Sequence, residues 1–172
     1  MQEIAALHAE EMGLGFHAMM EEKRAWVLAQ MLIRMDQLPK FQEEIKIKTW
    51  SNGPDGRFAF RDFLISNSKE ETIGKASSSW LVIDIEQKSI CRLDDYFPGH
   101  NYDQIYDVLG KRPERVKPLK DGELKGTLKV KFSDLDINGH VNNVRYIDFI
   151  MDAFPLDFRM NNTLYEIEMK FL

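Results

Sequence analysis

A carboxylate, an amide and an imidazole stand two residues apart in one short stretch of the chain, as Asp136, Asn138 and His140. In extended backbone this spacing places the three side chains on one face. His140 can handle a proton near neutral pH, and Asn138 can donate hydrogen bonds to a carbonyl oxygen. Asp136 can anchor the loop or orient the other two. The trio is therefore a candidate for acyl-transfer chemistry.

A purely structural interpretation of the same residues stays open. Asn138 and Gly139 form a typical turn dipeptide, and Asn142 or the asparagine after it can cap the helix predicted over residues 142–154. His140 would then be an ordinary surface residue. Turns rich in Asn and Asp are common before helices, so spacing alone does not separate the two interpretations.

The opening of this segment also matches a calcium-binding EF-hand loop, with Asp134, Asp136, Asn138 and Gly139 at the required positions. The twelfth position of such a loop should be a glutamate that binds the ion through both oxygens. Here that position is Arg145, whose positive charge opposes Ca²⁺. The segment before the loop also has the pattern of a strand, where an EF-hand has a helix, so calcium binding is disfavoured.

The elements that must position these residues are predicted from periodicity. Helical spacing predicts a helix over residues 2–12 and a second helical stretch over 19–35. Alternation of apolar and polar residues, with a turn at 52–56, predicts a hairpin within an antiparallel meander. The predicted strands of this meander cover residues 45–50, 57–65, 72–85 and 89–93.

The second half follows residues 94–125, a stretch rich in Asp, Gly, Pro and Lys, which indicates a linker. After it, the pattern predicts a strand at 127–132, a polar turn at 133–139, the helix at 142–154 and a final strand at 164–171. Residues 44–48 and 166–170 share an acid, an alternating pattern and a lysine, which suggests an internal duplication.

Composition excludes several classes of function. The net charge of −5 argues against nucleic-acid binding, which needs a concentrated basic surface. No apolar run is long enough for a membrane span, and the acidic N-terminus does not fit a signal peptide. The single cysteine, Cys91, forms no internal disulfide and lies in an alternating strand pattern, so we expect a structural residue in a cytoplasmic protein. The spacing of the histidines predicts no metal site, and no cofactor is predicted.

Residues 133–146, SDLDINGHVNNVRY, are very similar to the second-repeat signature of acyl-acyl-carrier-protein (acyl-ACP) thioesterases, the bacterial relatives of the plant fatty-acyl thioesterases. The length of this string makes the resemblance specific. Further similar stretches span nearly the whole chain, at residues 2–15, 47–53, 57–63 and 79–84.

The resemblance implies an α+β protein with a tandem hot-dog fold, in which an antiparallel sheet wraps around central helices. It implies hydrolysis of the thioester between a fatty acyl chain and the phosphopantetheine of acyl carrier protein, which releases free fatty acid and ends fatty acid synthesis. Asp136, Asn138 and His140 match the catalytic positions. The implied domains are an N-terminal repeat at 1–110, a linker at 111–125 and a C-terminal repeat at 126–172.

On the same resemblance the first repeat carries the acyl-chain pocket, and Trp50 and Trp80 are candidates for lining it, although aromatic residues in strands usually pack in a core. Basic residues of the linker could steer an acidic carrier protein, although we favour a solvated linker as their explanation. These residues are Lys111, Arg112, Arg115, Lys117 and Lys120.

Two features of the family pattern are not matched. The family has a further acidic residue, often beside a cysteine, after the strand that resembles residues 164–172, and an opening strand before the first helix. Glu166 and Glu168 lie earlier on the strand than that acid, so neither is assigned a catalytic role. We therefore expect a chain shortened at both ends, with weak or no activity. Unpaired strand edges would favour association into a homo-oligomer.

Two alternative functions stay open at this stage. One is hydrolysis of acyl-coenzyme A thioesters by the same trio. The other is a hot-dog module without catalysis that binds acyl chains or mediates association.

The calcium alternative is testable by melting. Since the twelfth position opposes the ion, we expect the melting temperature to stay unchanged when Ca²⁺ or a chelator is added. A rise in the melting temperature with Ca²⁺ that the chelator reverses would restore the calcium loop.

Overall fold

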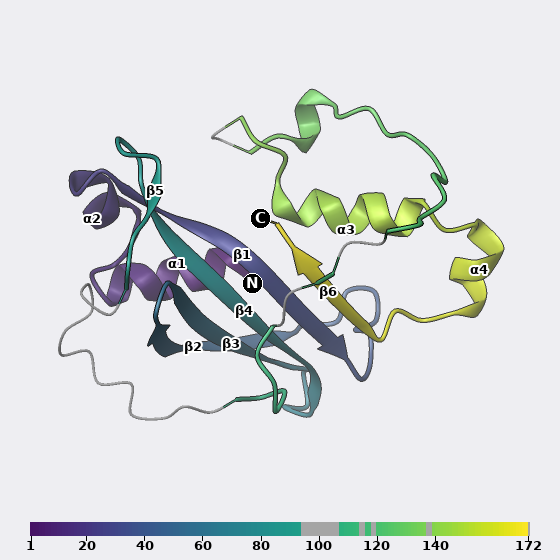
Figure 1. The fold of residues 1–172 in the computed structure, drawn as a ribbon. Helices are drawn as coiled ribbons and strands as arrows, with labels where there is room; N and C mark the ends of the chain where they lie inside the picture. The colour runs from purple at the N-terminus through teal and green to yellow at the C-terminus, as the bar shows by residue number, and fades with distance from the viewer. Residues whose placement is uncertain (94–106, 114–115, 118–119, 137–138, 172) are drawn as a thin grey trace. The chain divides into compact units, whose positions relative to one another are not determined.

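The computed structural model describes residues 1–93, 107–113, 116–117, 120–136 and 139–171. The chain divides into two compact units (Figure 1). The first unit consists of residues 1–116 together with 165–172, and the second of residues 117–164.

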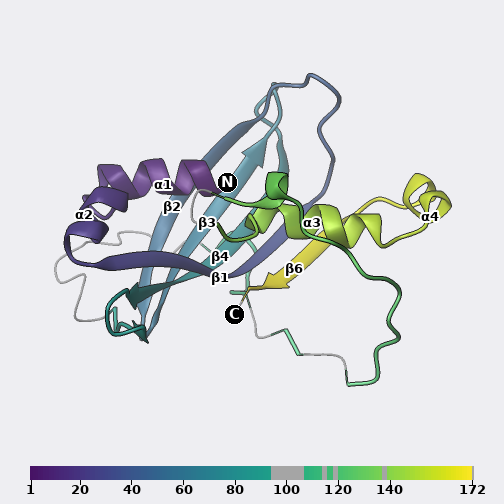
Figure 2. The same cartoon turned by 90° about the horizontal axis from the view of Figure 1, so that it is seen from above.

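The first unit is an antiparallel sheet with helices at its start. Its helices are α1 (Gln2–Glu11) and α2 (Phe16–Glu21), and its strands are β1 (Arg24–Met35), β2 (Lys46–Asp55), β3 (Phe58–Ser66), β4 (Thr72–Asp84), β5 (Ser89–Ile90) and β6 (Glu166–Lys170). Among the described residues the strand order is β2-β3-β4-β1-β6, with β5 paired to β4. Helix α1 lies along one face of this sheet (Figure 2). The predictions of the helix over 2–12, the meander and the final strand are confirmed.

The prediction of a second helix over residues 19–35 is wrong. Helix α2 ends at Glu21, and β1 begins three residues later. Strand β1 pairs with β4 on one edge and with β6 on the other, and its centre is buried from both faces of the sheet. A strand buried on both faces has no alternation of apolar and polar residues, so its sequence resembles that of a buried helix.

The hairpin between β2 and β3 forms, but its turn is later than predicted. Strand β2 continues through the expected turn to Asp55, and a register shift between Ser51 and Gly53 absorbs the irregular residues. The chain reverses at Gly56, whose φ of 63° lies in the left-handed region that glycine adopts without steric cost. A bulge inside the strand therefore explains the Gly-Pro pair that the sequence placed in the turn.

Part of the core of the first unit lies on the α1 side of the sheet. Phe63 and Ala76 face each other across β3 and β4 and are fully buried. At the other end of the sheet, Met19 from α2 packs with Val82 and Leu93. Cys91 packs against this cluster, as expected for a structural cysteine.

The second unit contains a 3-10 turn, η1 (Phe132–Asp134), followed by α3 (Asn143–Asp152) and α4 (Leu156–Asn161). The predicted helix over 142–154 is confirmed, and Asn142 is its N-cap because its side chain accepts the backbone N–H of Val144 at 3.0 Å. The predicted strand over 127–132 is wrong, since residues 127–131 are exposed and have no strand pairing. A segment with alternating apolar and polar residues forms a strand only when a neighbouring strand hydrogen-bonds to it. No described segment pairs with these residues.

The order of elements repeats, but not in the register suggested by the sequence. A helix, a short helix and a strand occur as α1-α2-β1 and again as α3-α4-β6, and β1 and β6 pair with each other. The element order therefore matches β6 with β1, whereas the similarity of residues 44–48 and 166–170 matched it with β2. Internal duplication stays a hypothesis, with this corrected correspondence.

Replacing Phe63 with Ala should lower the free energy of unfolding by about 3–5 kcal/mol, because the ring is 0% exposed and its removal leaves a cavity between β3 and β4. Urea denaturation followed by tryptophan fluorescence measures the change. Phe41→Ala is the matched control, since that ring is 93% exposed and its loss should change stability by less than about 0.5 kcal/mol. Equal losses in the two variants would contradict this description of the core.

Candidate active site

The candidate catalytic residues lie on a loop between η1 and α3, closed by backbone hydrogen bonds. Leu135 and Val141 form an antiparallel bridge, and the N–H of Asp136 donates to the carbonyl of His140 at 2.7 Å. The N–H of Gly139 donates to the carbonyl of Asp136 at 3.1 Å. Gly139 has a φ of 76°, so this reversal needs the conformational freedom of glycine.

Within this loop the structure brings Asp136 and His140 together. The backbone N–H of His140 donates to Oδ1 of Asp136 at 3.1 Å, so this carboxylate holds the two ends of the turn. Asp136 is half-buried, and His140 is exposed. Asn138 lies outside the described residues. The loop therefore turns back on itself, as the polar turn predicted over residues 133–139 implies, and it is not the extended backbone in which the three side chains would share one face.

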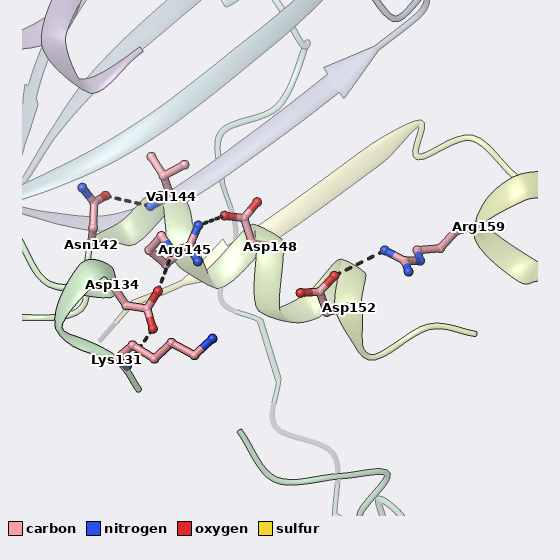
Figure 3. A network of polar contacts seen from close by, with 8 residues as sticks. All are labelled: Lys131, Asp134, Asn142, Val144, Arg145, Asp148, Asp152 and Arg159. Carbon is pink, nitrogen blue, oxygen red and sulfur yellow. Dashed lines mark hydrogen bonds and ion pairs between the residues drawn. The ribbon is translucent and has the colours of Figure 1, made fainter. Parts of the chain in front are cut away.

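Asp134, at the start of the loop, is a buried carboxylate at the centre of a polar network (Figure 3). Its Oδ2 accepts the backbone N–H of Lys131 at 2.8 Å, and its Oδ1 accepts Nε of Arg145 at 2.9 Å. Its carbonyl accepts the N–H of Asn142 at 2.8 Å. The hydrogen bond from Lys131, followed by the contacts with Arg145, holds the pKa of Asp134 below its ordinary value of 3.8.

Arg145, on the first turn of α3, joins this network to the helix. Its Nη1 also binds Asp148, and its guanidinium lies 5.7 Å from the ring centre of Phe149. Sequence reasoning assigned Asp134 only to a calcium loop and missed its pairing with Arg145. Both oxygens of this carboxylate bind protein donors, which argues against calcium. The sequence feature that could have indicated this pairing is an acid and an arginine on either side of the candidate loop.

Trp50 and Trp80 are half-buried in the first unit, on opposite faces of the sheet. Trp50 pairs in register with Asp62, whereas Trp80 pairs with Ala59, three residues along β3. Successive residues of a strand point to opposite faces, so an odd offset separates the two rings. Nε1 of Trp80 donates to the hydroxyl of Ser78 on the same face at 2.9 Å. The two rings therefore do not line one common surface.

Arg61 is a charged residue of the α1 face that sequence reasoning did not single out. Its side chain is 8% exposed, and Nη1 lies 3.0 Å from Nδ1 of His8 and 3.2 Å from the hydroxyl of Thr49. Burial lowers the pKa of Arg61 to about 10. Burial and then the charge of Arg61 lower the pKa of His8. This histidine is therefore engaged in packing α1 on the sheet.

Val108 and Arg112, two described residues of the predicted linker region, are bound to the sheet. The N–H of Val108 donates at 3.1 Å to Oδ2 of Asp62, a carboxylate that is 1% exposed and whose pKa is raised by burial. Arg112 pairs with Asp55 at 2.7 Å, and its guanidinium lies 4.2 Å from the ring centre of Phe60. These contacts are not expected of a solvated linker.

The remaining basic residues of the linker differ in their surroundings. Lys111 lies 3.5 Å from Glu166, which also pairs with Arg34 at 2.6 Å. The hydrogen bond from Arg34 lowers the pKa of Glu166, so this acid has a structural role in joining β6 to β1. Lys117 and Lys120 are exposed, and Arg115 lies outside the described residues.

An antiparallel sheet with a helix on one face is the hot-dog fold, and solved structures that match this chain include several thioesterases. An acyl-ACP thioesterase from Bacteroides thetaiotaomicron matches with a TM-score of 0.83 and 29% identity, over 99% of this chain and 69% of that one. The 12:0-ACP thioesterase from Umbellularia californica shares the fold, with a TM-score of 0.76 and 17% identity over 98% of this chain and 70% of that one. The predicted α+β hot-dog class is confirmed.

Sequence comparison identifies the family. Residues 1–98 match the acyl-ACP thioesterase N-terminal domain, and residues 117–172 match the C-terminal domain. The chain belongs to the acyl-ACP thioesterase family. The boundaries predicted at residues 110 and 126 stay predictions.

Curated relatives are longer than this chain. A chloroplastic palmitoyl-acyl carrier protein thioesterase from Gossypium hirsutum is 28% identical over 99% of this chain and 45% of its own length. A protein with the same description from Cuphea hookeriana is 30% identical over 90% of this chain and 40% of its own length. The chain spans about half the length of the curated relatives it matches. Among the described residues, no helix combines the length and apolar character that crossing a bilayer demands.

The lowered pKa of Asp134 has a consequence for stability. A carboxyl group with a pKa below its unfolded value stabilises the fold above that value, and this contribution is lost as the pH falls through the folded pKa. We expect the loop to lose order below about pH 3.8, the ordinary value of this group. In Asp134→Asn the loop should already be loosened at neutral pH and should show less further change with acid.

Amide NMR signals of Gly139, His140 and Asn142, recorded between pH 7 and pH 3, measure this loss. Asp152→Asn is the control: it removes an exposed carboxylate from α3 and should retain the wild-type profile. An identical acid profile in wild type and Asp134→Asn would contradict the assignment.

Proposed function

We propose that this chain carries the hydrolytic loop of an acyl-ACP thioesterase and hydrolyses the thioester between a fatty acyl chain and its carrier. The observation that supports this most directly is the closed loop of residues 134–142, within the segment matched by the family's C-terminal domain. It holds a carboxylate and an imidazole on one tight turn next to the start of a helix. Such a loop suits acyl transfer, which needs a proton carrier beside a polarised carbonyl.

The proposed reaction is the addition of water to the thioester carbonyl carbon. His140 removes a proton from the water as it attacks, and Asn138 stabilises the negative charge that develops on the carbonyl oxygen. The carbon–sulfur bond then breaks, and the thiol of the carrier's phosphopantetheine leaves with a proton. The products are a free fatty acid and the free thiol. No metal or cofactor takes part in this scheme.

Asp136 has the role of holding the loop. Its side chain binds the backbone N–H of His140, and its backbone binds the carbonyl of the same residue. These contacts are made to the main chain of His140, so they restrain the backbone position from which its imidazole extends. This supports the anchoring role that the family resemblance implied for Asp136.

Acyl carrier protein is the proposed partner, and Trp50 and Trp80 are separate candidates for contact with the acyl chain. Only Trp80 shares the α1 face with the buried core of the sheet, so we favour it. The basic linker residues are weaker candidates for contact with the carrier, because Lys111 and Arg112 have acidic partners within the chain. A cytoplasmic location is part of the proposal and rests on the single cysteine.

A second candidate is a module that binds acyl chains without hydrolysing them. The ion pairs of Glu166 favour it, because they occupy one of the two acids closest in sequence to the position where the family has its further acid. Substitution in the loop separates the two functions, since it should affect turnover and leave binding unchanged if hydrolysis occurs there.

Asn138→Ala should lower kcat roughly 100-fold or more, because it removes a donor to the developing oxyanion. His140→Ala should reduce turnover to a similar extent by removing the proton acceptor. Both variants should retain the affinity of the parent for a non-hydrolysable acyl-carrier analogue. Thiol release from acyl-ACP measures turnover, and calorimetry measures affinity.

His17→Ala is a matched control, since this histidine belongs to the first unit and is exposed. A purified chain that binds acyl groups but releases no thiol would support the module without catalysis. One acyl group presented on acyl carrier protein and on coenzyme A distinguishes the two carriers: a higher kcat/KM with coenzyme A would contradict the proposed substrate.

A further inference from the structure

The loop that carries Asp136 and His140 is closed by contacts between its two ends. These include the bridge between Leu135 and Val141, two backbone bonds at the turn and the hydrogen bond that the backbone N–H of His140 donates to the carboxylate of Asp136. The imidazole itself is exposed. The conformation of the turn therefore depends on how its two stems are held.

Asp134 holds both stems at once. Its Oδ2 fixes the N–H of Lys131 and so closes the 3-10 turn that enters the loop, while its carbonyl accepts the N–H of Asn142 on the stem that leaves it. Its Oδ1 reaches Arg145 on the first turn of α3. Figure 3 shows the contacts of Lys131 and Arg145 converging on this carboxylate.

Burial gives this arrangement its strength. Asp134 is 2% exposed, so its negative charge is out of contact with water and must be balanced by protein donors. The described cation that touches it is Arg145, which is itself oriented by Asp148. Without the guanidinium, the buried oxygen would lose its charged partner, and water would have to enter beside α3. Asp134 and Arg145 thus form a clamp between the stems of the loop and the helix.

We propose that Asp134 and Arg145 are positioning residues for the thioester hydrolysis: the ion pair between the buried carboxylate and the half-exposed guanidinium holds the turn at Asp136 and His140 in the conformation that the reaction uses. This inference rests on the proposed function. Neither residue belongs to the trio assigned to the chemistry. Their effect on the rate arises because a catalytic group displaced by about 1 Å can lose roughly 100-fold in rate.

The kinetic test compares Asp134→Asn, Arg145→Gln and the double variant with the parent chain on acyl-ACP. Each single variant should lower kcat roughly 10- to 100-fold with KM changed less than about twofold, because the loop acts on the reacting carbonyl and not on the carrier. The double variant should be no slower than the slower single variant, since both remove the same contact. Arg145→Lys should restore part of kcat by restoring the charge.

Asp152→Asn is the matched control. It breaks the ion pair with Arg159 at 3.3 Å in the same unit, on the same helix, without touching the loop. It should leave kcat within about twofold of the parent. Losses that multiply in the double variant, a rise in KM at constant kcat, or an equal loss in Asp152→Asn would overturn the proposal.

Amide hydrogen exchange keeps the clamp testable apart from catalysis. In Asp134→Asn, exchange at the N–H groups of His140 and Asn142 should accelerate about tenfold or more, while the amides of α4 should be unaffected. If the parent chain releases no thiol but exchange accelerates, the proposed function fails and the clamp stands. If exchange at these two amides is unchanged, the clamp is wrong whatever the activity.

Discussion

Strand β1 is the element on which the first unit depends. It lies inside the sheet, hydrogen-bonded to β4 along one edge and to β6 along the other. Its centre is buried on both faces, with Leu32 fully enclosed. Through it a segment from the end of the chain joins strands from the first half, and the pair of Arg34 and Glu166 ties the two together. Disrupting β1 would therefore expose apolar surface on both faces and detach β6.

Among the described residues, three ionisable side chains are buried, and their charges are compensated in different ways. Asp134 has a guanidinium partner, and hydrogen bonds lower its pKa. Asp62 accepts hydrogen bonds from the backbone N–H of Val108 and from the side chains of Ser77 and Asn52, but burial dominates and raises its pKa. Arg61 has the neutral partners His8 and Thr49, and burial lowers its pKa. The direction of each shift follows from whether desolvation or a compensating partner dominates.

These differences matter for function because the Asp134 pair belongs to the same unit as the candidate catalytic turn and contacts its stems. The contact of Asp62 with Val108 fixes the segment after the meander to the sheet, and the contact of Arg61 with His8 fixes α1. The pair of Asp134 and Arg145 fixes a loop whose remaining bonds are mostly backbone bonds. Charge at this position therefore constrains geometry close to the proposed chemistry, although it does not react.

The candidate site was predictable from sequence because its key features are local. Asp136 and His140 are four residues apart, and the cap at Asn142 needs only the first turn of the helix it starts. Chain order and residue type are enough to propose such a turn. The pairing of Asp134 with Arg145 was not predicted. Its importance depends on the burial of the Asp134 carboxylate, and burial cannot be read from the amino-acid sequence.

The sequence itself determined the hairpin between β2 and β3, the strand β4 and the helices α1 and α3, since each is indicated by the residue types and spacing of its own segment. Tertiary structure alone decided three other features. Residues 24–35 became a strand because two neighbouring strands hydrogen-bond to them, and residues 127–131 did not because no described strand does. Trp50 and Trp80 fell on opposite faces because the register between strands, which no single segment specifies, sets the direction of each side chain.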